Sequence, residues 1–461
     1  MNQTRPVILQ WMDSTLTELP AVELPLRAAG SGTLAAFLAR AAVDHGPIFR
    51  SVIPAGREAG RVVVFMVGPA ANRMVLHTHR DHFSHDQGWT PVLGATIGRG
   101  LLNMDDPTHA HHRKLWNPAF TSAYMEAYMP VVQRVIVEWT RGWHERGEID
   151  LYEEARWLTF DIAAHVLAGL PDQAALARAR ELFAWLFHGH GRRLSRQALQ
   201  RQKAGARQEL DELFRALIAA RRRIPPAEQP RDVLGLLAHA RDEQGRPLKD
   251  AQIVAHLNIL LIAGHETTTT FSTWALHLLA TLPEHRERIR AELRTLRLDG
   301  DGQFAAAALQ ALPWLDYFVR EVGRLYTPVL NLPRGVVKPF TFDGYDVPAG
   351  VSVRLAIAAG HRLPQFFAAP ETFDPGRFAP PREEDKRRPY ALVPFGAGPR
   401  ICIGIGFAQI EVKALVAHVL QWYDLQPVPD QLPVHAGFWV ARVPFGIRTR
   451  ITSRDDRGTA H

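Results

Sequence analysis

The chain has 461 residues, 46% of them hydrophobic and 22% charged, which is enough apolar material to bury a large core. Its single cysteine excludes an internal disulfide framework, and no run of about 18 apolar residues is present to span a membrane. The net charge of +7 would suit nucleic acid, an anionic membrane or an acidic partner, but a plain Arg-rich surface is the alternative, because the cations are dispersed without a nucleic-acid motif. We expect a cytoplasmic protein without signal peptide, transmembrane anchor or nucleic-acid partner.

The first part of the chain predicts a mixed region. Two β-rich runs, 48–53 and 62–67, flank a turn rich in Pro, Gly and charge at 54–60, and a helix is expected over 69–76. From about residue 108 helical periodicity dominates. Amphipathic helices are expected over 125–146, 152–169, 173–187 and 206–223.

The longest apolar helix is expected over 253–282, largely buried, with Asp250 as its N-cap and Pro283 as its stop. Beyond it the pattern predicts strands at 335–345 and 351–356, an irregular section at 364–389, a helix at 404–423, a β element at 438–451 and a flexible tail from about 452. Length alone predicts about three domains of roughly 150 residues each. Because no linker divides the sequence, we expect one domain over 1–461, with an ordered core from about 45 to 450.

The sole cysteine lies in the segment Phe395-Gly-Ala-Gly-Pro-Arg-Ile-Cys402-Ile-Gly. Gly398 and Gly404 let the backbone approach a flat group, and the start of the following helix favours a thiolate at Cys402, the form that binds haem iron. Arg400 is expected to pair with a propionate, and Phe395 to shield the sulfur. A lone cysteine is otherwise most often a small buried hydrophobe.

At every fixed position this segment resembles the haem-binding signature of the cytochrome P450 family, Phe-x-x-Gly-x-Arg-x-Cys-x-Gly. The resemblance implies a mainly α fold, with a large helical region and a small β-rich lobe in one unit. It further implies heme b (iron protoporphyrin IX) with Cys402 as the axial iron ligand, O2 as co-substrate, and a monooxygenase activity. Further motifs follow in the family's order between Asp106 and Gly404.

Ala263-Gly-His-Glu-Thr267 lies within the expected buried helix. An acid and a hydroxyl are costly there unless they are satisfied, and threonines that bond back to earlier carbonyls bend a helix. The segment resembles the family's oxygen-activation motif, which implies that Ala263 and Gly264 contact the cofactor, that Thr267 bonds the bound oxygen and that Glu266 helps deliver protons. A satisfied polar patch is the alternative. The intact motif also argues against family variants that use peroxide.

Glu321-Val-Gly-Arg324 spells Glu-x-x-Arg, which carries no information by itself. The same spacing recurs in two other pairs, Glu153/Arg156 and Glu287/Arg290. What distinguishes Glu321 and Arg324 is their place between the oxygen motif and Cys402. By resemblance they form a structural ion network with Arg377, which comes from the irregular section.

Two more matches concern the propionates. His109 and Arg113 resemble the family's His-x-x-x-Arg pair, and Arg334 is a third candidate by resemblance. A metal site built from His109, His111 and His112 is one alternative, and plain surface histidines are another.

By resemblance the substrate pocket includes Trp89, Asn258, Val329, Asn331 and Phe438. Since its segments are mainly apolar, we expect a small hydrophobic substrate. The basic stretch 192–207 is interpreted as a solvated helix face and loop, with attraction of an acidic substrate or a membrane surface as the alternative.

No Gly-x-Gly-x-x-Gly follows a strand, so no fused nicotinamide or flavin module is expected. Electrons should come from an external ferredoxin or flavodoxin and its NAD(P)H-dependent reductase, docking near His112, Arg113 and Lys114, and we expect a monomer. The rival functions are a haem-binding sensor without turnover, which would not need Glu266 and Thr267, and a helical interaction protein without a cofactor.

Overall fold

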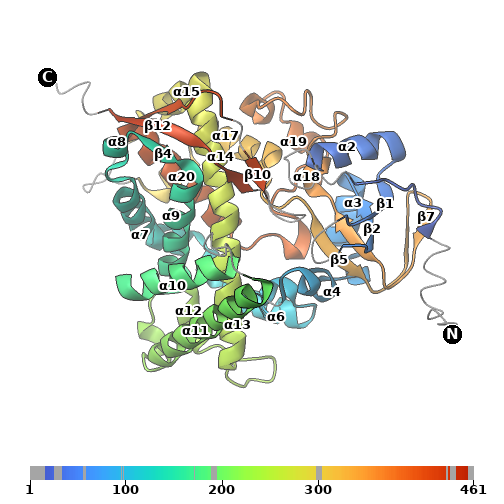
Figure 1. Cartoon of the computed structure of the whole chain (residues 1–461), viewed down its shortest axis with the longest axis horizontal. Helices are drawn as coiled ribbons and strands as arrows, with labels where there is room; N and C mark the ends of the chain where they lie inside the picture. Colours follow the sequence, from blue (N-terminus) through green and yellow to red (C-terminus); the bar gives the residue numbers. More distant parts are fainter. Residues whose placement is uncertain are drawn as a thin grey trace.

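The computed structural model describes residues 16–24, 34–54, 59–94, 96, 98–170, 172–187, 195–296, 304–431, 434–436 and 443–454. Most of the described chain is helical. Figure 1 shows most of the helices gathered on one side and a smaller lobe with strands β1, β2 and β5 on the other. None of the described helices is long and apolar enough to cross a membrane. The predicted division into a helical region and a small β-rich lobe is confirmed.

The helices extend over much of the sequence. They are α2 (Leu34–His45), α3 (Pro69–Arg73), α4 (His85–Trp89), α6 (Thr108–Trp116), α7 (Ser122–Thr140), α8 (Trp143–Arg146), α9 (Leu151–Val166), α10 (Gln173–Phe187), α11 (Arg196–Arg222), α12 (Val233–Ala238), α13 (Asp250–Leu261), α14 (Thr267–Thr281), α15 (Pro283–Leu293), α16 (Ala306–Gln310), α17 (Pro313–Leu325), α18 (Ile357–Gly360), α19 (Glu384–Arg387) and α20 (Ile405–Trp422). The helix predicted over 125–146 is two helices, since Gly142 adopts φ +78° between α7 and α8. The helix predicted to begin at residue 206 begins at Arg196.

The main sheet combines strands from distant parts of the sequence. Its order is β1 (Ile48–Val52), β2 (Val62–Met66), β8 (Ser352–Leu355), β5 (Leu332–Val336), β3 (Phe83–Ser84). The β2–β8 pair is parallel, with Val64 opposite Val353, and the other pairs are antiparallel. Both of those residues are fully buried, as expected for strands in the centre of a sheet that is covered on both faces.

Three smaller sheets complete the β structure of the described chain. The first has the order β4 (Glu148–Asp150), β12 (Arg448–Ser453), β9 (Tyr423–Pro427). The others are the hairpins β6 (Phe340–Phe342) with β7 (Tyr345–Val347) and β10 (Val434–Ala436) with β11 (Val443–Phe445). Strand β12 continues to Ser453, close to the start of the predicted tail. Residues 455–461 lie outside the described part, and the single-domain boundary stays a prediction.

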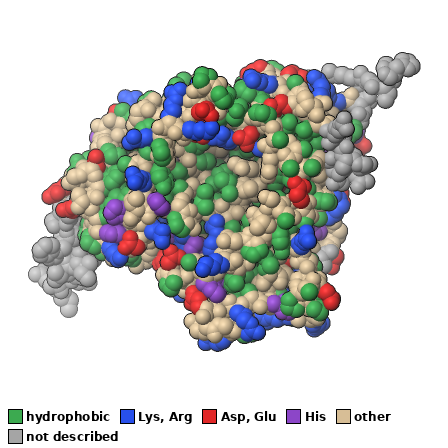
Figure 2. Space-filling view, turned by 180° about the vertical axis from the view of Figure 1, so that it is seen from behind, with side chains coloured by type: hydrophobic (Ala, Val, Ile, Leu, Met, Phe, Trp, Pro, Cys, Tyr) green, Lys and Arg blue, Asp and Glu red, His purple; other side chains and the backbone are tan. Residues whose placement is uncertain are grey.

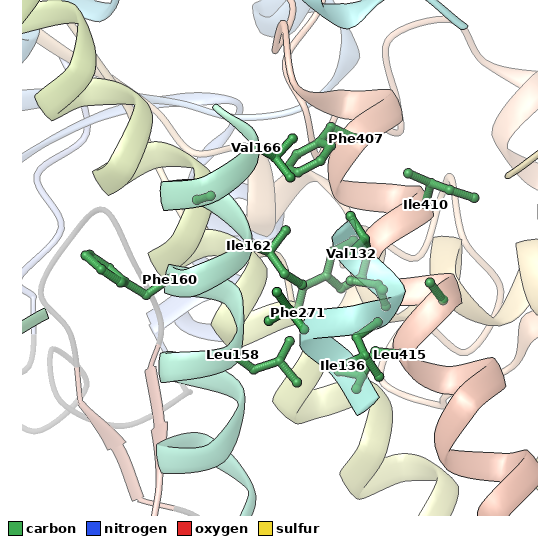
Figure 3. Close-up of a cluster of buried hydrophobic side chains, with 14 of the residues drawn as sticks. Val132, Ile136, Leu158, Phe160, Ile162, Val166, Phe271, Phe407, Ile410 and Leu415 are labelled. Atoms are coloured by element: carbon green, nitrogen blue, oxygen red, sulfur yellow. The ribbon is translucent and has the colours of Figure 1, made fainter. Parts of the chain in front are cut away.

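The largest core lies where α7, α9, α14 and α20 meet. Apolar side chains at helical spacing, such as Val132 and Ile136 on α7, point toward Ile162 of α9, Phe271 of α14 and Leu415 of α20 (Figure 3). Phe160 leaves α9 on the other side in the same view and packs there against Phe183 and His265. Helix α9 is therefore buried on two faces.

The long apolar helix is interrupted in its middle. Helix α13 passes through one wider π turn, Ile262–Glu266, before α14 continues to Thr281. Lys249, not Asp250, is the N-cap, and Pro283 opens α15 after the predicted stop. Threonines 267–270 each donate a side-chain hydrogen bond to the carbonyl four residues earlier. A π turn of this kind is frequent at functional sites, because it displaces one turn of backbone.

Candidate active site

The loop that carries Cys402 is held in one conformation. The Cys402 backbone N–H donates a 2.9 Å hydrogen bond to the carbonyl oxygen of Phe395. Gly398 adopts φ +67°, and a Cβ there would lie 2.3 Å from the carbonyl oxygen of Leu76, so only glycine fits. The predicted need for glycine in this segment is met at Gly398.

Cys402 retains accessible surface although protein atoms surround its sulfur. Burial raises the pKa of the thiol, and the backbone N–H of Gly404 and the charge of Arg113 oppose that rise without cancelling it. Burial of the sulfur by itself does not favour a thiolate. A bound metal cation would, because it deprotonates a coordinating thiol outright.

Three basic side chains converge beside this loop. Arg400 Nε donates to His85 Nε2 at 3.1 Å, so the His85 ring accepts there and is neutral. Burial, with the charges of Arg334 and Arg400, holds the pKa of His85 well below its usual range. Burial also lowers the pKa of Arg334 to about 9 and that of Arg400 to about 10, so both stay charged at neutral pH.

The two arginines have unused donors. Arg334 Nε and Arg400 Nη1 are buried and have no hydrogen-bond partner among the described residues. Asp105 is the carboxylate whose charge acts on Arg334. Its oxygens already accept hydrogen bonds from the Ser84 hydroxyl and the His85 backbone N–H, each at 2.6 Å. Such a site is costly until an anion fills it. Carboxylates of the kind that haem propionates carry fit these donors, so the residues present suit that cofactor.

The other two predicted propionate residues, His109 and Arg113, make contacts within the protein. His109 is buried, with Nδ1 3.3 Å from an oxygen of Asp106. Arg113 donates to the carbonyl oxygen of Ile401 at 2.7 Å and to Asn117 at 3.2 Å. The structure thus brings Arg113 to the cysteine loop, while no contact joins it to Arg334 or Arg400.

The three neighbouring histidines do not converge. His111 bonds the carbonyl oxygen of Arg241 at 2.8 Å, whereas His112 bonds the buried ring of His256 at 2.9 Å. Over the described ranges no group of three or more His, Cys, Asp or Glu side chains could hold a metal ion. The alternative of a histidine metal site therefore gains no support.

The π turn interrupts a buried helix with an accessible patch. Every residue from Ile253 to Leu261 is buried, as is every residue from Thr268 to Leu276, but Ala263 is exposed and Glu266 is partly accessible. Thr267 Oγ1 donates to the Ala263 carbonyl oxygen at 2.6 Å. His265 Nε2 lies 3.6 Å from Glu266 Oε1. An acid and a hydroxyl beside an opened helical turn can bind and pass protons.

The predicted pocket residues differ in burial and in hydrogen bonding. Trp89 and Asn331 are buried, and Val329 is partly exposed. Asn258 is buried and its amide N–H groups are bonded to Asp211 and to the Val254 carbonyl oxygen. Those bonds bind Asn258 to the protein instead of leaving its amide N–H groups for a substrate. Phe438 lies outside the described residues.

The predicted ion network exists and is larger than expected. Glu321 and Arg324 are joined by two 2.8 Å bonds, Arg377 Nε reaches Glu321 at 2.9 Å, and all three side chains are fully buried. Arg377 also bonds Glu384 at 2.7 Å, and Glu384 was not predicted. Since every charge has a partner of opposite sign, the role is structural.

Sequence reasoning also missed His85 and Glu411. His85 is part of no motif, and only the fold brings it to Arg400. Glu411 lies on α20, nearly fully buried, and neither carboxyl oxygen has a hydrogen-bond partner among the described residues. Burial raises its pKa well above the usual range. A signal was available, because an acid in the apolar sequence of α20 is unusual.

Comparison with known proteins agrees with this site. The sequence model of the family described as Cytochrome P450 matches residues 17–440. A Mycobacterium tuberculosis protein designated cytochrome P450 136 is 33% identical over 383 residues, 80% of this chain and 75% of its own. A Synechocystis protein designated cytochrome P450 120 is 30% identical, over 84% of this chain and 85% of its own. The solved structure of retinoic-acid-bound cyanobacterial CYP120A1 matches with a TM-score of 0.79 and 28% identity, over 94% of this chain and 99% of that chain.

Proposed function

The chain belongs to the cytochrome P450 family, and on this premise we propose that it inserts one oxygen atom of O2 into a hydrophobic small molecule, using electrons from separate redox proteins. Membership of the family supports a haem-thiolate monooxygenase activity in general. The observation that carries the proposal is the pair of buried, unpartnered donors on Arg334 and Arg400 beside the accessible Cys402.

Each residue has a role in this proposal. Cys402 would hold the iron of heme b through its thiolate, and the haem would supply the oxidising chemistry. Arg334 and Arg400 hold its propionates, with His85 as the neutral partner of Arg400. Phe395, at the start of the cysteine loop, limits the access of water to the sulfur.

The π turn supplies the proton pathway in the proposal. Glu266 takes protons from solvent through its partly accessible carboxylate, and Thr267 presents its hydroxyl at the opened turn. The reaction needs two protons and two electrons for each O2, since one oxygen atom enters the substrate and the other leaves as water. Controlled proton entry keeps electron use matched to product.

The electron donor is proposed to be a ferredoxin or flavodoxin with an NAD(P)H-dependent reductase. Lys114 is exposed on α6, the helix whose Arg113 contacts Ile401 next to Cys402. Together with the net charge of +7, this favours an acidic protein at that face. A cytoplasmic location follows from the same partners.

The test uses the purified haem-loaded protein. The reduced CO complex should show the strongly red-shifted Soret band of thiolate-ligated haem, and a surrogate ferredoxin system should consume NAD(P)H only when a substrate is present. A Soret band without this red shift would show that Cys402 is not the iron ligand. A shifted band with no substrate-dependent consumption across a broad hydrophobic panel would favour the haem-binding sensor.

A further inference from the structure

The side chain of His265 is held in one orientation inside the π turn. It is almost fully buried, and its Nδ1 lies 3.2 Å from the carbonyl oxygen of Leu261. The rings of Phe160 and Phe183 stand nearly perpendicular to it, with centroids 5.3 and 5.4 Å away. Because a carbonyl oxygen only accepts hydrogen bonds, Nδ1 carries the hydrogen, and the other nitrogen, Nε2, is the one that can take up a proton.

The Nε2 atom of His265 faces the carboxylate of Glu266. The distance from Nε2 to Glu266 Oε1 is 3.6 Å, although neighbouring residues of a regular α-helix do not face each other. The contact occurs within the wider turn, where the carbonyl oxygen of His265 accepts from the Thr269 hydroxyl at 2.9 Å and from the Thr159 hydroxyl of α9 at 3.4 Å. The fold therefore fixes the backbone at the point where the two side chains meet.

An unprotonated Nε2 and an ionised carboxylate are both hydrogen-bond acceptors. At 3.6 Å, with the ring buried, the two groups repel each other unless a proton lies between them. One proton satisfies the pair in either arrangement, as a neutral ring with a protonated acid or as a charged ring with a carboxylate. Two groups that interact in this way titrate as a unit.

Helix α9 brings charged and titratable groups toward the pair. Burial and then the charge of Glu266 raise the pKa of the Tyr152 hydroxyl, so it stays neutral, while Arg156 acts on the same hydroxyl in the opposite direction. Arg156 is itself paired with Glu153 at 3.4 Å. Helices α10 and α14 contribute an aromatic ring and threonine hydroxyl groups. Neither kind of group stores a proton at neutral pH, so storage falls to His265 and Glu266.

We propose that His265 is a positioning residue of the proton pathway, which shares one proton with Glu266 and so keeps that acid loaded at a higher pH than a lone carboxyl group would allow. This inference rests on the proposed function and adds a residue to its pathway. When Glu266 passes its proton toward Thr267, the carboxylate is left beside Nε2, which favours uptake of the next proton from solvent. Each proton delivered is replaced by one from solvent, and His265 ends each cycle unchanged.

The first test follows the product formed per NAD(P)H as a function of pH in the haem-loaded protein. His265→Gln replaces the imidazole by an amide, which can donate a hydrogen bond to Glu266 but cannot take up a proton. Since such a bond favours the ionised acid, coupling should be lost at a pH lower by about one unit or more, and should be similar to that of the unchanged protein at acidic pH. His277→Gln is the control and should not alter the profile, because His277 lies on the adjoining α14 and burial alone lowers its pKa to about 4.

The second test requires no turnover. NMR of the protein with isotope-labelled histidine, as the diamagnetic reduced CO complex, follows the protonation of each ring with pH, and the His265 signal is the one absent from His265→Gln. Its midpoint should fall by about one pH unit or more in Glu266→Gln, because the carboxylate that stabilises the charged ring is gone. If His265→Gln does not fold, Glu266→Gln still decides: a histidine midpoint that falls supports the shared proton, and unchanged midpoints for all histidines contradict it.

A purely structural role of His265 predicts lower coupling in His265→Gln with an unchanged pH profile, and that result would overturn the inference. Equal shifts of the profile in His265→Gln and His277→Gln would do the same. A protein whose CO complex lacks the thiolate band, or that consumes no NAD(P)H with any substrate, fails the proposed function instead. The two failures are distinguishable, because the histidine midpoint is measured without turnover.

Discussion

Thr267 Oγ1 donates a 2.6 Å hydrogen bond to the carbonyl oxygen of Ala263, across the π turn of the long helix. The hydroxyl oxygen keeps its acceptor capacity, which a proton relay requires. Thr267→Ala should therefore preserve the fold and lower the product formed per NAD(P)H by about tenfold or more. Thr268→Ala is the control, because Thr268 makes the same kind of bond to Gly264 but is buried. If Thr267→Ala forms as much product per NAD(P)H as the unchanged protein, Thr267 takes no part in the proton relay.

Arg334→Gln should weaken retention of the haem. The buried Nε of Arg334 has no partner among the described residues, and its positive charge and that of Arg400 both act on the neutral His85 until an anion binds. Haem transfer to apomyoglobin should be about tenfold faster in the variant, while the haem-free form should be no less stable. Arg320→Gln, at a partly exposed ion pair with Asp385, should leave the transfer rate unchanged. Equal transfer from both variants would contradict a propionate role.

Glu321→Gln should cost about 3–5 kcal/mol of unfolding free energy, because it leaves Arg324 and Arg377 buried with an incomplete set of anions. The measurement is urea unfolding of the haem-loaded protein. Glu153→Gln provides a matched control with the same sequence spacing, since Glu153 is half exposed and lies 3.4 Å from Arg156. That change should alter stability by less than about 1 kcal/mol. A similar cost for both would show that burial does not distinguish the pairs.

Glu411 should make stability depend on pH. Its folded-state pKa is raised by burial, so the folded protein holds a proton that the unfolded chain releases above its ordinary pKa of 4.5. The stabilisation is complete below that value and is lost as pH rises toward the folded pKa. Glu411→Gln should flatten this decline in unfolding free energy measured from pH 5 to 8. A decline of the same slope in the variant would assign it to another group.

Lys114→Glu should slow electron transfer from an acidic ferredoxin, with an effect that shrinks as salt is added. Lys114 is exposed beside Arg113, which is bonded to the cysteine loop and is therefore less suited to the test. Stopped-flow reduction measures the rate. Lys249→Glu, a charge reversal at the N-cap of α13, should have no such effect. A loss independent of salt would argue against electrostatic docking.

Sequence reasoning succeeded where the evidence was local. The glycines and Arg400 around Cys402, and the polar residues of the π turn, are neighbours in sequence and could be recognised together. His85 and Glu384 could not be found in this way, because each meets its partner only through the fold. Asn258 was expected to line the substrate pocket, and no pattern in the sequence indicates that its amide N–H groups are bonded to Asp211 and Val254.

The predicted boundaries of two helices were wrong for a related reason. Helical periodicity continues across Gly142, so the turn between α7 and α8 was not predicted. The first turns of α11 are strongly basic, and a charged stretch without an apolar stripe resembles a loop. Those same turns carry Gln200 and Lys203 into the lining of a cavity of about 710 Å³, which the sequence alone did not reveal.

The order β1-β2-β8-β5-β3 has a consequence for biosynthesis. Strand β2 has left the ribosome long before its parallel neighbour β8, because the helices from α3 to α17 are translated between them. Until Leu355 emerges, the apolar side chains of β2 and β1 lack their final neighbours on the nascent chain. This lobe therefore closes late, and translation of the C-terminal third should limit how fast the newly made protein becomes resistant to proteases.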